Sequence, residues 1–303
     1  MVMGYMLDDL VAKFRPYTDQ GRVAGYIPEL LKANPQDLGI AIYDRHGHIH
    51  TCGAVQSKFT LQSVSKPFAL ALALMDHGPE GVFSRIGMEP TGDSFNSLMK
   101  LETFSSLKPV NPLVNAGAIA TTSLIKGSCA EEKFSRLINF IRSLAPSCYV
   151  SFNADVYRSE SLTGDRNRAI AYFLRDIRAI DGEAEECLDL YFRQCSIEVD
   201  CVTLAALGLA LSVLPPEFSV IPPLYARIIR TFMFTCGMYD ASGEFAIKVG
   251  IPAKSGVSGA IMGVVPNKLG LGVYGPALDI KGNSVAGVAL LRALCSREDW
   301  AIL

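Results

Sequence analysis

The chain has few of the features that mark metal-binding, membrane-associated or nucleic-acid-binding proteins. Only 19% of its 303 residues are charged, the net charge is −2 at pH 7, and the basic residues form no stripe. The electrostatic field of so small a net charge attracts neither nucleic acid nor an anionic membrane. The eight cysteines include no Cys-x-x-Cys pair and no spacing typical of zinc sites. We therefore expect no metal, no cofactor, and neither nucleic acid nor a membrane as a partner.

Long apolar segments are also missing. The N-terminal segment contains Asp8 and Asp9 and lacks the apolar core of a secretory signal. The longest apolar run, over residues 202–214, is too short to span a bilayer and is interrupted by Thr203 and Ser212. These absences predict a cytoplasmic protein whose cysteines are reduced thiols in the core.

Apolar residues, by contrast, are abundant, because half of the chain is hydrophobic and can form a sizeable core. Short apolar runs bounded by turn residues predict strands near both ends of the chain, at residues 38–43, 48–54, 59–62, 245–250, 259–265 and 269–274. Helical periodicity predicts helices at residues 7–17, 66–76, 131–144, 166–180, 184–194, 202–214 and 284–296. Gly78-Pro79 is expected to end the second of these helices.

This order of elements predicts an α/β (α+β) fold. One antiparallel sheet is built from both chain ends and flanked by helices, and a central helical subdomain packs against it. We expect a single domain over residues 1–303, with a sheet part at 1–62 and 236–303 and a helical part at 63–235. The site is expected between the two parts, where clefts usually form.

A serine and a lysine three residues apart form the first candidate for chemistry. On a helix, Ser63 and Lys66 would share a face, as an amide-cleaving nucleophile and its base require. Pro67 is tolerated only in the first turn of a helix, so Ser63 should lie at the helix start, where the helix dipole favours an alkoxide. Burial in this apolar segment would favour the neutral, basic form of Lys66. The alternative is a buried capping serine beside a lysine.

The same spacing recurs at Ser97–Lys100, Ser105–Lys108 and Ser123–Lys126, where it more simply reflects surface coincidence. A second feature favours the first pair. Lys254-Ser255-Gly256 lies in the strand-rich C-terminal region, and a Lys-Ser/Thr-Gly strand beside Ser-x-x-Lys is typical of penicillin-recognising enzymes. An ordinary Gly-rich strand turn is the alternative.

Three histidines offer a possible metal site. His46, His48 and His50 alternate along the first hairpin, and zinc could use such a set. Their position at a turn between two strands favours solvent exposure instead, so we assign no metal.

A series of ordered stretches resembles the serine-dependent glutaminase family, which shares its fold with serine β-lactamases and DD-peptidases. The resemblance extends from Gly21 to about Gly287, nearly the whole chain. The stretches are GRVAGYIP around Tyr26, LQSVSKPF around Ser63, EPTGDSFNS from Glu89, NPLVNAGAI around Asn115, ESLTGDRNRAIAY from Glu160, YFRQCSIEV from Tyr191, CGMYDASGEFA around Tyr239, GIPAKSGVSGAIMGVVP around Val257 and GNSVAG from Gly282.

The resemblance implies hydrolysis of L-glutamine to L-glutamate and ammonia, in a homodimer or homotetramer without a cofactor. It implies that Ser63 is the nucleophile, Lys66 its base and Tyr239 a proton relay, with the backbone N–H groups of Ser63 and Val257 forming the oxyanion hole. The glutamine-binding positions of the family are matched by Tyr26, Ser63, Asn115, Glu160, Asn167, Tyr191, Tyr239 and Val257. Glu160 suits the substrate ammonium, and the amides and phenols can donate to its carboxylate.

The chain departs from the family pattern in three places, none of which is a proposed catalytic residue. Gly25 replaces an acid before Tyr26, Gly275 replaces a serine before Pro276, and residues 212–223 are Pro-rich. The last change is expected to reshape a loop of the helical part.

Two rival functions remain open at this level. A β-lactamase or peptidoglycan peptidase would use the same Ser-Lys chemistry, with Ser94-Phe95-Asn96 or Ser151-Phe152-Asn153 as its Ser-x-Asn element. Such enzymes act outside the cytoplasm, for which the chain shows no export signal. An amino-acid sensor could keep the pocket without catalysis, but the intact set of Ser63, Lys66 and Tyr239 argues against it.

Overall fold

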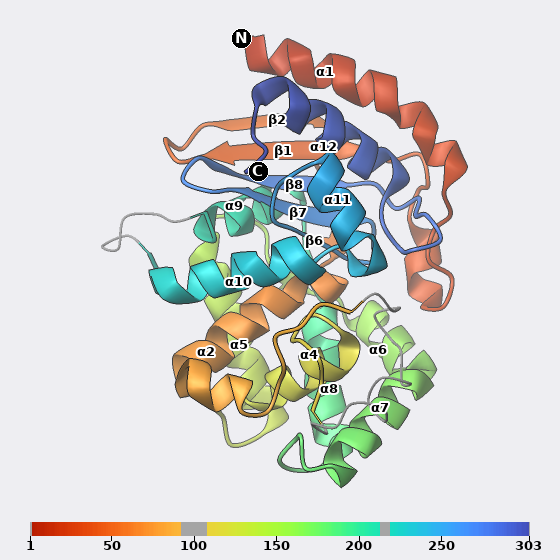
Figure 1. Cartoon of the computed structure of the whole chain (residues 1–303). Coiled ribbons are helices and arrows are strands. Elements are labelled where there is room, and N and C mark those ends of the chain that lie inside the picture. Colours follow the sequence, from red (N-terminus) through yellow and green to blue (C-terminus); the bar gives the residue numbers. More distant parts are fainter. Residues whose placement is uncertain (1, 92–107, 213–218, 303) are drawn as a thin grey trace.

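Five antiparallel strands form the main sheet of the computed structural model, which describes residues 2–91, 108–212 and 219–302 (Figure 1). Their order is β2-β1-β8-β7-β6. The bounds are β1 Gly39–Asp44, β2 Ile49–Gly53, β6 Ala253–Ser255, β7 Ala260–Val265 and β8 Leu269–Tyr274. β1 pairs with β8, with Ala41 opposite Gly272, so the two ends of the chain meet in the centre of the sheet. The predicted antiparallel sheet from both chain ends is confirmed.

Helices cover both faces of this sheet, as Figure 1 shows. α1 (Val2–Phe14), α11 (Ser242–Lys248) and α12 (Val285–Glu298) pack on one face, against Ile40 and Ile42. α9 (Cys201–Ala210) packs on the other face, along β8. A Cβ atom at Gly272 would lie 2.2 Å from the carbonyl oxygen of Cys201, so only glycine permits this close approach of helix and strand.

The remaining helices form the layer below the sheet in Figure 1, and a smaller three-stranded sheet joins them. The helices are α2 Lys66–Phe83, α4 Asn115–Ser123, α5 Ala130–Leu144, α6 Ala154–Thr163, α7 Asp165–Asp176, α8 Ala184–Cys195 and α10 Pro223–Cys236. The small sheet has the order β3-β5-β4, with β3 Phe59–Thr60, β4 Ser151–Phe152 and β5 Ile197–Val199. Short 3-10 helices are η1 Arg15–Gln20, η2 Pro28–Lys32, η3 Gln62–Ser65 and η5 Tyr239–Ala241. Within the described ranges, no helix combines the length and apolarity needed to cross a membrane.

The strand predicted at residues 245–250 is wrong, because this segment belongs to α11 and the loop after it. Phe245 and Val249 are both buried, whereas Ile247 between them is 88% exposed. A strand would place all three side chains on one face, but the helical period of about four places only the first and last together. The Glu244–Lys248 ion pair across one helical turn also fits this period.

The predicted stop at Gly78-Pro79 is only partly correct. Gly78 does leave the helical conformation, with φ at 68°, but helical structure resumes after it and α2 ends at Phe83. Proline is compatible with the first turn of this second helical piece because its missing N–H needs no partner there.

Candidate active site

Ser63 lies on η3, the single 3-10 turn that leads directly into α2. Pro67 occupies the first turn of α2. Ser63 therefore lies just before the start of the helix, as the position of Pro67 predicts. The residue before Ser63 is strained, because Gln62 has φ at 47°, in the left-handed region. The Ser65 hydroxyl donates to the Gln62 carbonyl at 2.6 Å and supports this turn. Strain of this kind clusters at functional sites.

Lys66 is the first residue of α2 and is only 1% exposed. Its Nζ donates to Asn115 Oδ1 at 2.7 Å and to the Leu113 carbonyl at 3.1 Å. Burial lowers the pKa of Lys66 to about 8, although the negative charge of Glu160 has the opposite, smaller effect. Among the described hydrogen bonds, Lys66 donates to these two oxygens and not to Ser63. Catalytic hydrogen bonds often form fully only when substrate is bound.

A cavity of about 270 Å³ opens beside this junction, between η3 and the helices of the lower layer. Six of the residues predicted for the site line it: Tyr26, Ser63, Asn115, Glu160, Asn167 and Tyr191. Asn115 connects several of them. Its Oδ1 accepts from Lys66 and from the Tyr191 hydroxyl at 3.3 Å, and its Nδ2 donates to Asn167 Oδ1 at 3.0 Å.

Glu160 places a carboxyl group in this cavity while being only 6% exposed. Burial raises the pKa of Glu160 to about 8, whereas the hydrogen bond from Gln62, the charge of Lys66 and the hydrogen bond with Cys195 lower it. The Gln62 Nε2 donates to Glu160 Oε2 at 3.3 Å. A desolvated carboxylate gains most from a cation that fits beside it, so Glu160 suits an ammonium ligand.

Tyr239, on η5, and Val257, in the turn after β6, are not among the residues that line this cavity but lie near the turn of Ser63. The Tyr239 hydroxyl donates to the Ser255 carbonyl at 3.1 Å and is hydrogen-bonded with Ser63. Burial raises the pKa of Tyr239, so the phenol stays neutral. A Cβ at Gly256 would lie 2.7 Å from the Leu61 carbonyl, so glycine is what allows the strand turn carrying Val257 to approach η3.

Three residues at the cavity fall within the stretches that carry the resemblance but were not assigned a role from the sequence. Gln62 supports Glu160, and the Cys195 thiol is hydrogen-bonded with Glu160 and Tyr191. The spacing of Tyr191 and Cys195 by four residues on α8 was a usable signal, because such residues share a helix face. Arg166 is exposed and adds a cation at the cavity wall.

The other sequence candidates lie elsewhere. Ser123 ends α4 and donates to the Ala120 carbonyl, while Lys126 is exposed. Asn153 caps α6 by accepting from the Val156 N–H at 3.0 Å, which accounts for that Ser-x-Asn element structurally. The elements at 94–96, 97–100 and the serine at 105 lie outside the described residues, as do residues 213–218 of segment 212–223.

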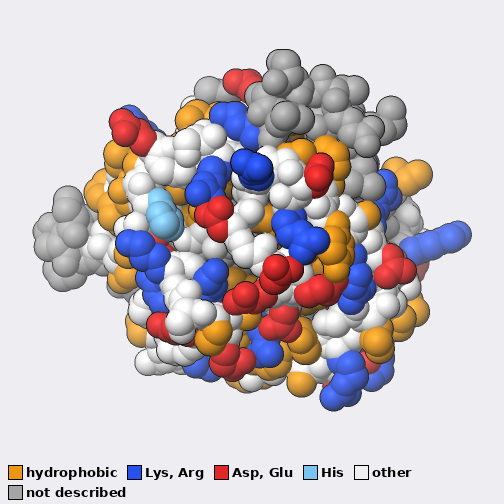
Figure 2. All heavy atoms as spheres, turned by 90° about the horizontal axis from the view of Figure 1, so that it is seen from below, with side chains coloured by type: hydrophobic (Ala, Val, Ile, Leu, Met, Phe, Trp, Pro, Cys, Tyr) orange, Lys and Arg blue, Asp and Glu red, His pale blue; other side chains and the backbone are white. Residues whose placement is uncertain are grey.

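The histidines of the first hairpin form ordinary turn contacts. His48 Nδ1 lies 2.9 Å from Asp44 Oδ2, and His46 contacts Arg45. No group of three or more histidine, cysteine or acidic side chains able to hold a metal ion occurs in the described part of the chain. On the face in Figure 2, acidic and basic side chains are interspersed, in keeping with the small net charge.

Comparison with known proteins agrees with this arrangement. The family model "Glutaminase" matches residues 21–303. A glutaminase of Clostridioides difficile is 55% identical over 296 residues, which cover 96% of each chain. The crystal structure of a probable glutaminase from Bacillus subtilis has a TM-score of 0.92 at 37% identity and covers 99% of this chain and 97% of the other. A covalent complex of a Bacillus subtilis glutaminase with 5-oxo-L-norleucine, formed from 6-diazo-5-oxo-L-norleucine, has a TM-score of 0.90 at 36% identity, with 99% of both chains covered.

The fold and its structural relatives define a hydrolase of the β-lactamase-like class. Within that class, the chain belongs to the glutaminase family and is a glutaminase.

Proposed function

We propose that this chain hydrolyses the side-chain amide of L-glutamine through a serine acyl-enzyme, with Ser63 as nucleophile and Lys66 as base. The observation that carries the proposal is the position of Lys66, a fully buried lysine one turn after Ser63. Burial lowers the pKa of Lys66 to about 8. A lysine of that kind is neutral in a useful fraction of molecules near neutral pH and can accept the serine proton.

The proposed reaction has two stages, acylation of Ser63 and hydrolysis of the acyl-enzyme. Lys66 takes the proton of Ser63, whose oxygen attacks the amide carbon and forms a C–O bond. The oxyanion accepts hydrogen bonds from the backbone N–H groups of Ser63 and Val257. The C–N bond then breaks, and the proton returns to the leaving nitrogen through Lys66 and Tyr239, which releases ammonia. Water attacks the acyl-enzyme by the reverse route, with Lys66 again as base, and releases glutamate.

The cavity matches the two α-groups of glutamine. Glu160 holds the ammonium, and Asn115, Asn167 and Tyr191 provide donors for the carboxylate. Tyr26 borders the mouth of the cavity, and Arg166 at its wall adds positive charge toward the carboxylate. These anchors fix the distance from the α-carbon to Ser63 and so select the length of the side chain.

Covalent labelling tests the nucleophile. The chain should react with 6-diazo-5-oxo-L-norleucine, as its Bacillus subtilis relative does, and peptide mass spectrometry should place the adduct on Ser63. The Cys195 thiol, the Thr163 hydroxyl and the Glu160 carboxyl are further nucleophilic groups that line the cavity. An adduct on Cys195, with Ser63 unmodified, would overturn the assignment.

Replacing Glu160 with glutamine should weaken the discrimination between glutamine and 4-carbamoylbutanoate, the analogue that lacks the amine. The buried carboxylate gives the ammonium a charged partner worth roughly 2–5 kcal/mol, so kcat/KM for glutamine should fall about 30-fold or more while the analogue is little affected. Steady-state kinetics on both substrates measure the ratio. An unchanged ratio would show that Glu160 is not the ammonium partner.

The activity should fall as the pH drops through about 8. Lys66 must be unprotonated to act as base, and Glu160 must be ionised to hold the ammonium; the pKa of each lies at about 8. Both groups therefore gain their inactivating proton in the same range, and log kcat/KM should approach a slope of about two on the acid side. In Glu160→Gln the slope should drop to about one, since one titration is removed. A slope of about one in wild type would contradict this scheme.

A further inference from the structure

The turn that carries Tyr239 is held in a strained conformation. Tyr239 has φ at 58°, in the left-handed region that a bulky residue rarely adopts. Such strain persists only where surrounding contacts enforce it. Gly237, two residues earlier, directly follows α10 and lies against β6, where a Cβ atom would be 1.8 Å from the Ala253 carbonyl.

Lys254 provides the inner contacts of this turn. It is 0% exposed and lies on β6, the edge strand that faces the turn. Its Nζ donates to the Gly237 carbonyl at 3.0 Å and to the Ser255 carbonyl at 2.5 Å. The same Nζ lies 4.2 Å from the centre of the Tyr239 ring. The Ser255 carbonyl is also the acceptor of the Tyr239 hydroxyl, so one oxygen fixes both side chains.

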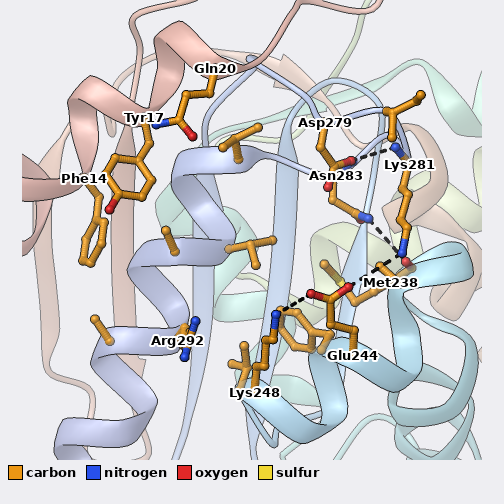
Figure 3. Close-up of a pocket in the computed structure, with 18 of the residues that line it drawn as sticks. Phe14, Tyr17, Gln20, Met238, Glu244, Lys248, Asp279, Lys281, Asn283 and Arg292 are labelled. Atoms are coloured by element: carbon orange, nitrogen blue, oxygen red, sulfur yellow. Dashed lines mark hydrogen bonds and ion pairs between the residues drawn. The ribbon is translucent and has the colours of Figure 1, made fainter.

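The outer side of the turn is held by a different residue. The Asn283 amide donates to the Met238 carbonyl at 3.4 Å, at the wall of a second, larger cavity between α11 and α12 (Figure 3). In that cavity, Lys281 and Lys248 both pair with Glu244. Asn283 and Lys254 therefore both hold the turn, and Lys254 also contacts the Tyr239 ring.

We propose that Lys254 is a positioning residue for the reaction, which holds the Tyr239 hydroxyl against Ser63 by clamping the Gly237–Tyr239 turn to β6. The proposal rests on the proposed role of Tyr239 as proton relay. It gives a role to the Lys254-Ser255-Gly256 segment, which takes no part in the proposed mechanism. Lys254 touches no substrate atom and acts through Tyr239.

The charge state of Lys254 fits this role. Burial lowers the pKa of Lys254 well below its usual range, and the charge of Lys66 lowers it further. A neutral amine has two N–H donors, which match the two carbonyls it contacts. It adds no positive charge that would compete with the base function of Lys66.

A double-mutant cycle of Lys254→Met and Tyr239→Phe tests the proposal. Methionine keeps the volume of the side chain. In the Lys254→Met single variant, both carbonyls retain another donor, Ser255 N–H for Gly237 and the Tyr239 hydroxyl for Ser255. Because neither carbonyl is left without a donor, the melting temperature of this single variant should fall by only a few degrees. Tyr239→Phe should lower kcat about 100-fold. Lys254→Met should lower kcat about 10- to 100-fold with KM within about threefold, since a displacement of roughly 1 Å has this cost.

The double variant distinguishes the outcomes. If Lys254 acts only through the Tyr239 hydroxyl, adding Lys254→Met to Tyr239→Phe should lower kcat by less than about twofold. Fully multiplicative losses would overturn the clamp while leaving the proposed function intact. A Tyr239→Phe variant with wild-type kcat would instead refute the proposed relay.

A matched control and a milder variant complete the test. Lys58 Nζ lies 4.1 Å from the centre of the Tyr149 ring and pairs with Asp200, so it repeats the lysine–tyrosine contact away from the active-site cavity. Lys58→Met should leave kcat unchanged. If Lys254→Met does not fold, Lys254→Gln, which retains an amide donor, replaces it in the cycle, and the same criteria apply. A Lys254 variant that folds with unchanged kcat would also overturn the proposal.

Discussion

Replacing Ser63 with alanine is expected to lower kcat for ammonia release from glutamine by on the order of 10⁴-fold or more. Loss of one member of a nucleophile–base unit removes most of the acceleration that the unit provides, and what remains comes from binding and oxyanion stabilisation. Ser63 is also hydrogen-bonded with Tyr239, and losing one such bond costs only about 1 kcal/mol of folding free energy. Activity should therefore disappear while the fold persists.

Two measurements separate loss of chemistry from loss of structure. The thermal unfolding midpoint should move by only a few degrees, and glutamine should still bind in a calorimetric titration because Glu160, Asn115 and Asn167 remain. The variant should also form no adduct with 6-diazo-5-oxo-L-norleucine. Retention of more than a few per cent of wild-type ammonia release would show that another group is the nucleophile.

Most of the fold is readable from the sequence because its main elements have clear local patterns. β1 and β8 are short apolar runs bounded by turn residues, and their central position follows from burial on both faces. α11 is not readable in the same way. Its apolar residues, Phe245, Ile247 and Val249, fit a strand equally well, and only burial of Phe245 and Val249 in the core beside the sheet selects the helix.

The candidate site likewise contains residues that local sequence rules bring together and residues that only the tertiary fold brings together. Ser63 and Lys66 are close in sequence, and Pro67 fixes the helix start, so elementary rules bring them together. Lys66 and Asn115 are 49 residues apart, and Gln62 and Glu160 are 98 apart. Such pairs depend on how α4 and α6 pack around η3, which no local pattern encodes. Asn115 and Glu160 were predicted only through the family resemblance, and Gln62 was not predicted.

The contacts of Lys254 illustrate the same limit. The Lys-Ser-Gly segment is visible in the sequence, but the left-handed conformation of Tyr239 and the two carbonyls beneath it are not. A sequence motif identifies the residue types, whereas the closeness of α10 and β6 at Gly237 decides what the lysine can reach.

Replacing Lys66 should be almost as damaging as replacing Ser63. Methionine is the better substitution for the measurement, because Lys66 is 1% exposed and Lys66→Ala would leave a buried cavity. Without Lys66, the Ser63 proton loses the amine one turn away as its acceptor, and Tyr239 cannot replace it as a base because burial raises the pKa of Tyr239 and keeps its phenol neutral. We expect kcat for glutamine to fall by on the order of 10³-fold or more, with a smaller change in KM. The Asn115 side chain loses one donor but keeps Tyr191 and Asn167, so the cavity should stay formed.

The double variant Ser63→Ala/Lys66→Met tests whether the two residues act as one unit. A base has no role once its nucleophile is absent, so the double variant should be no slower than the slower single variant. If Lys66 instead contributed through its charge, for example by attracting the substrate carboxylate, its loss would persist without Ser63 and the two effects would multiply. Residual ammonia release must be measured at enzyme concentrations high enough to detect rates near those of Ser63→Ala. A double variant far slower than both single variants would assign Lys66 an electrostatic role and leave Ser63 without an identified base.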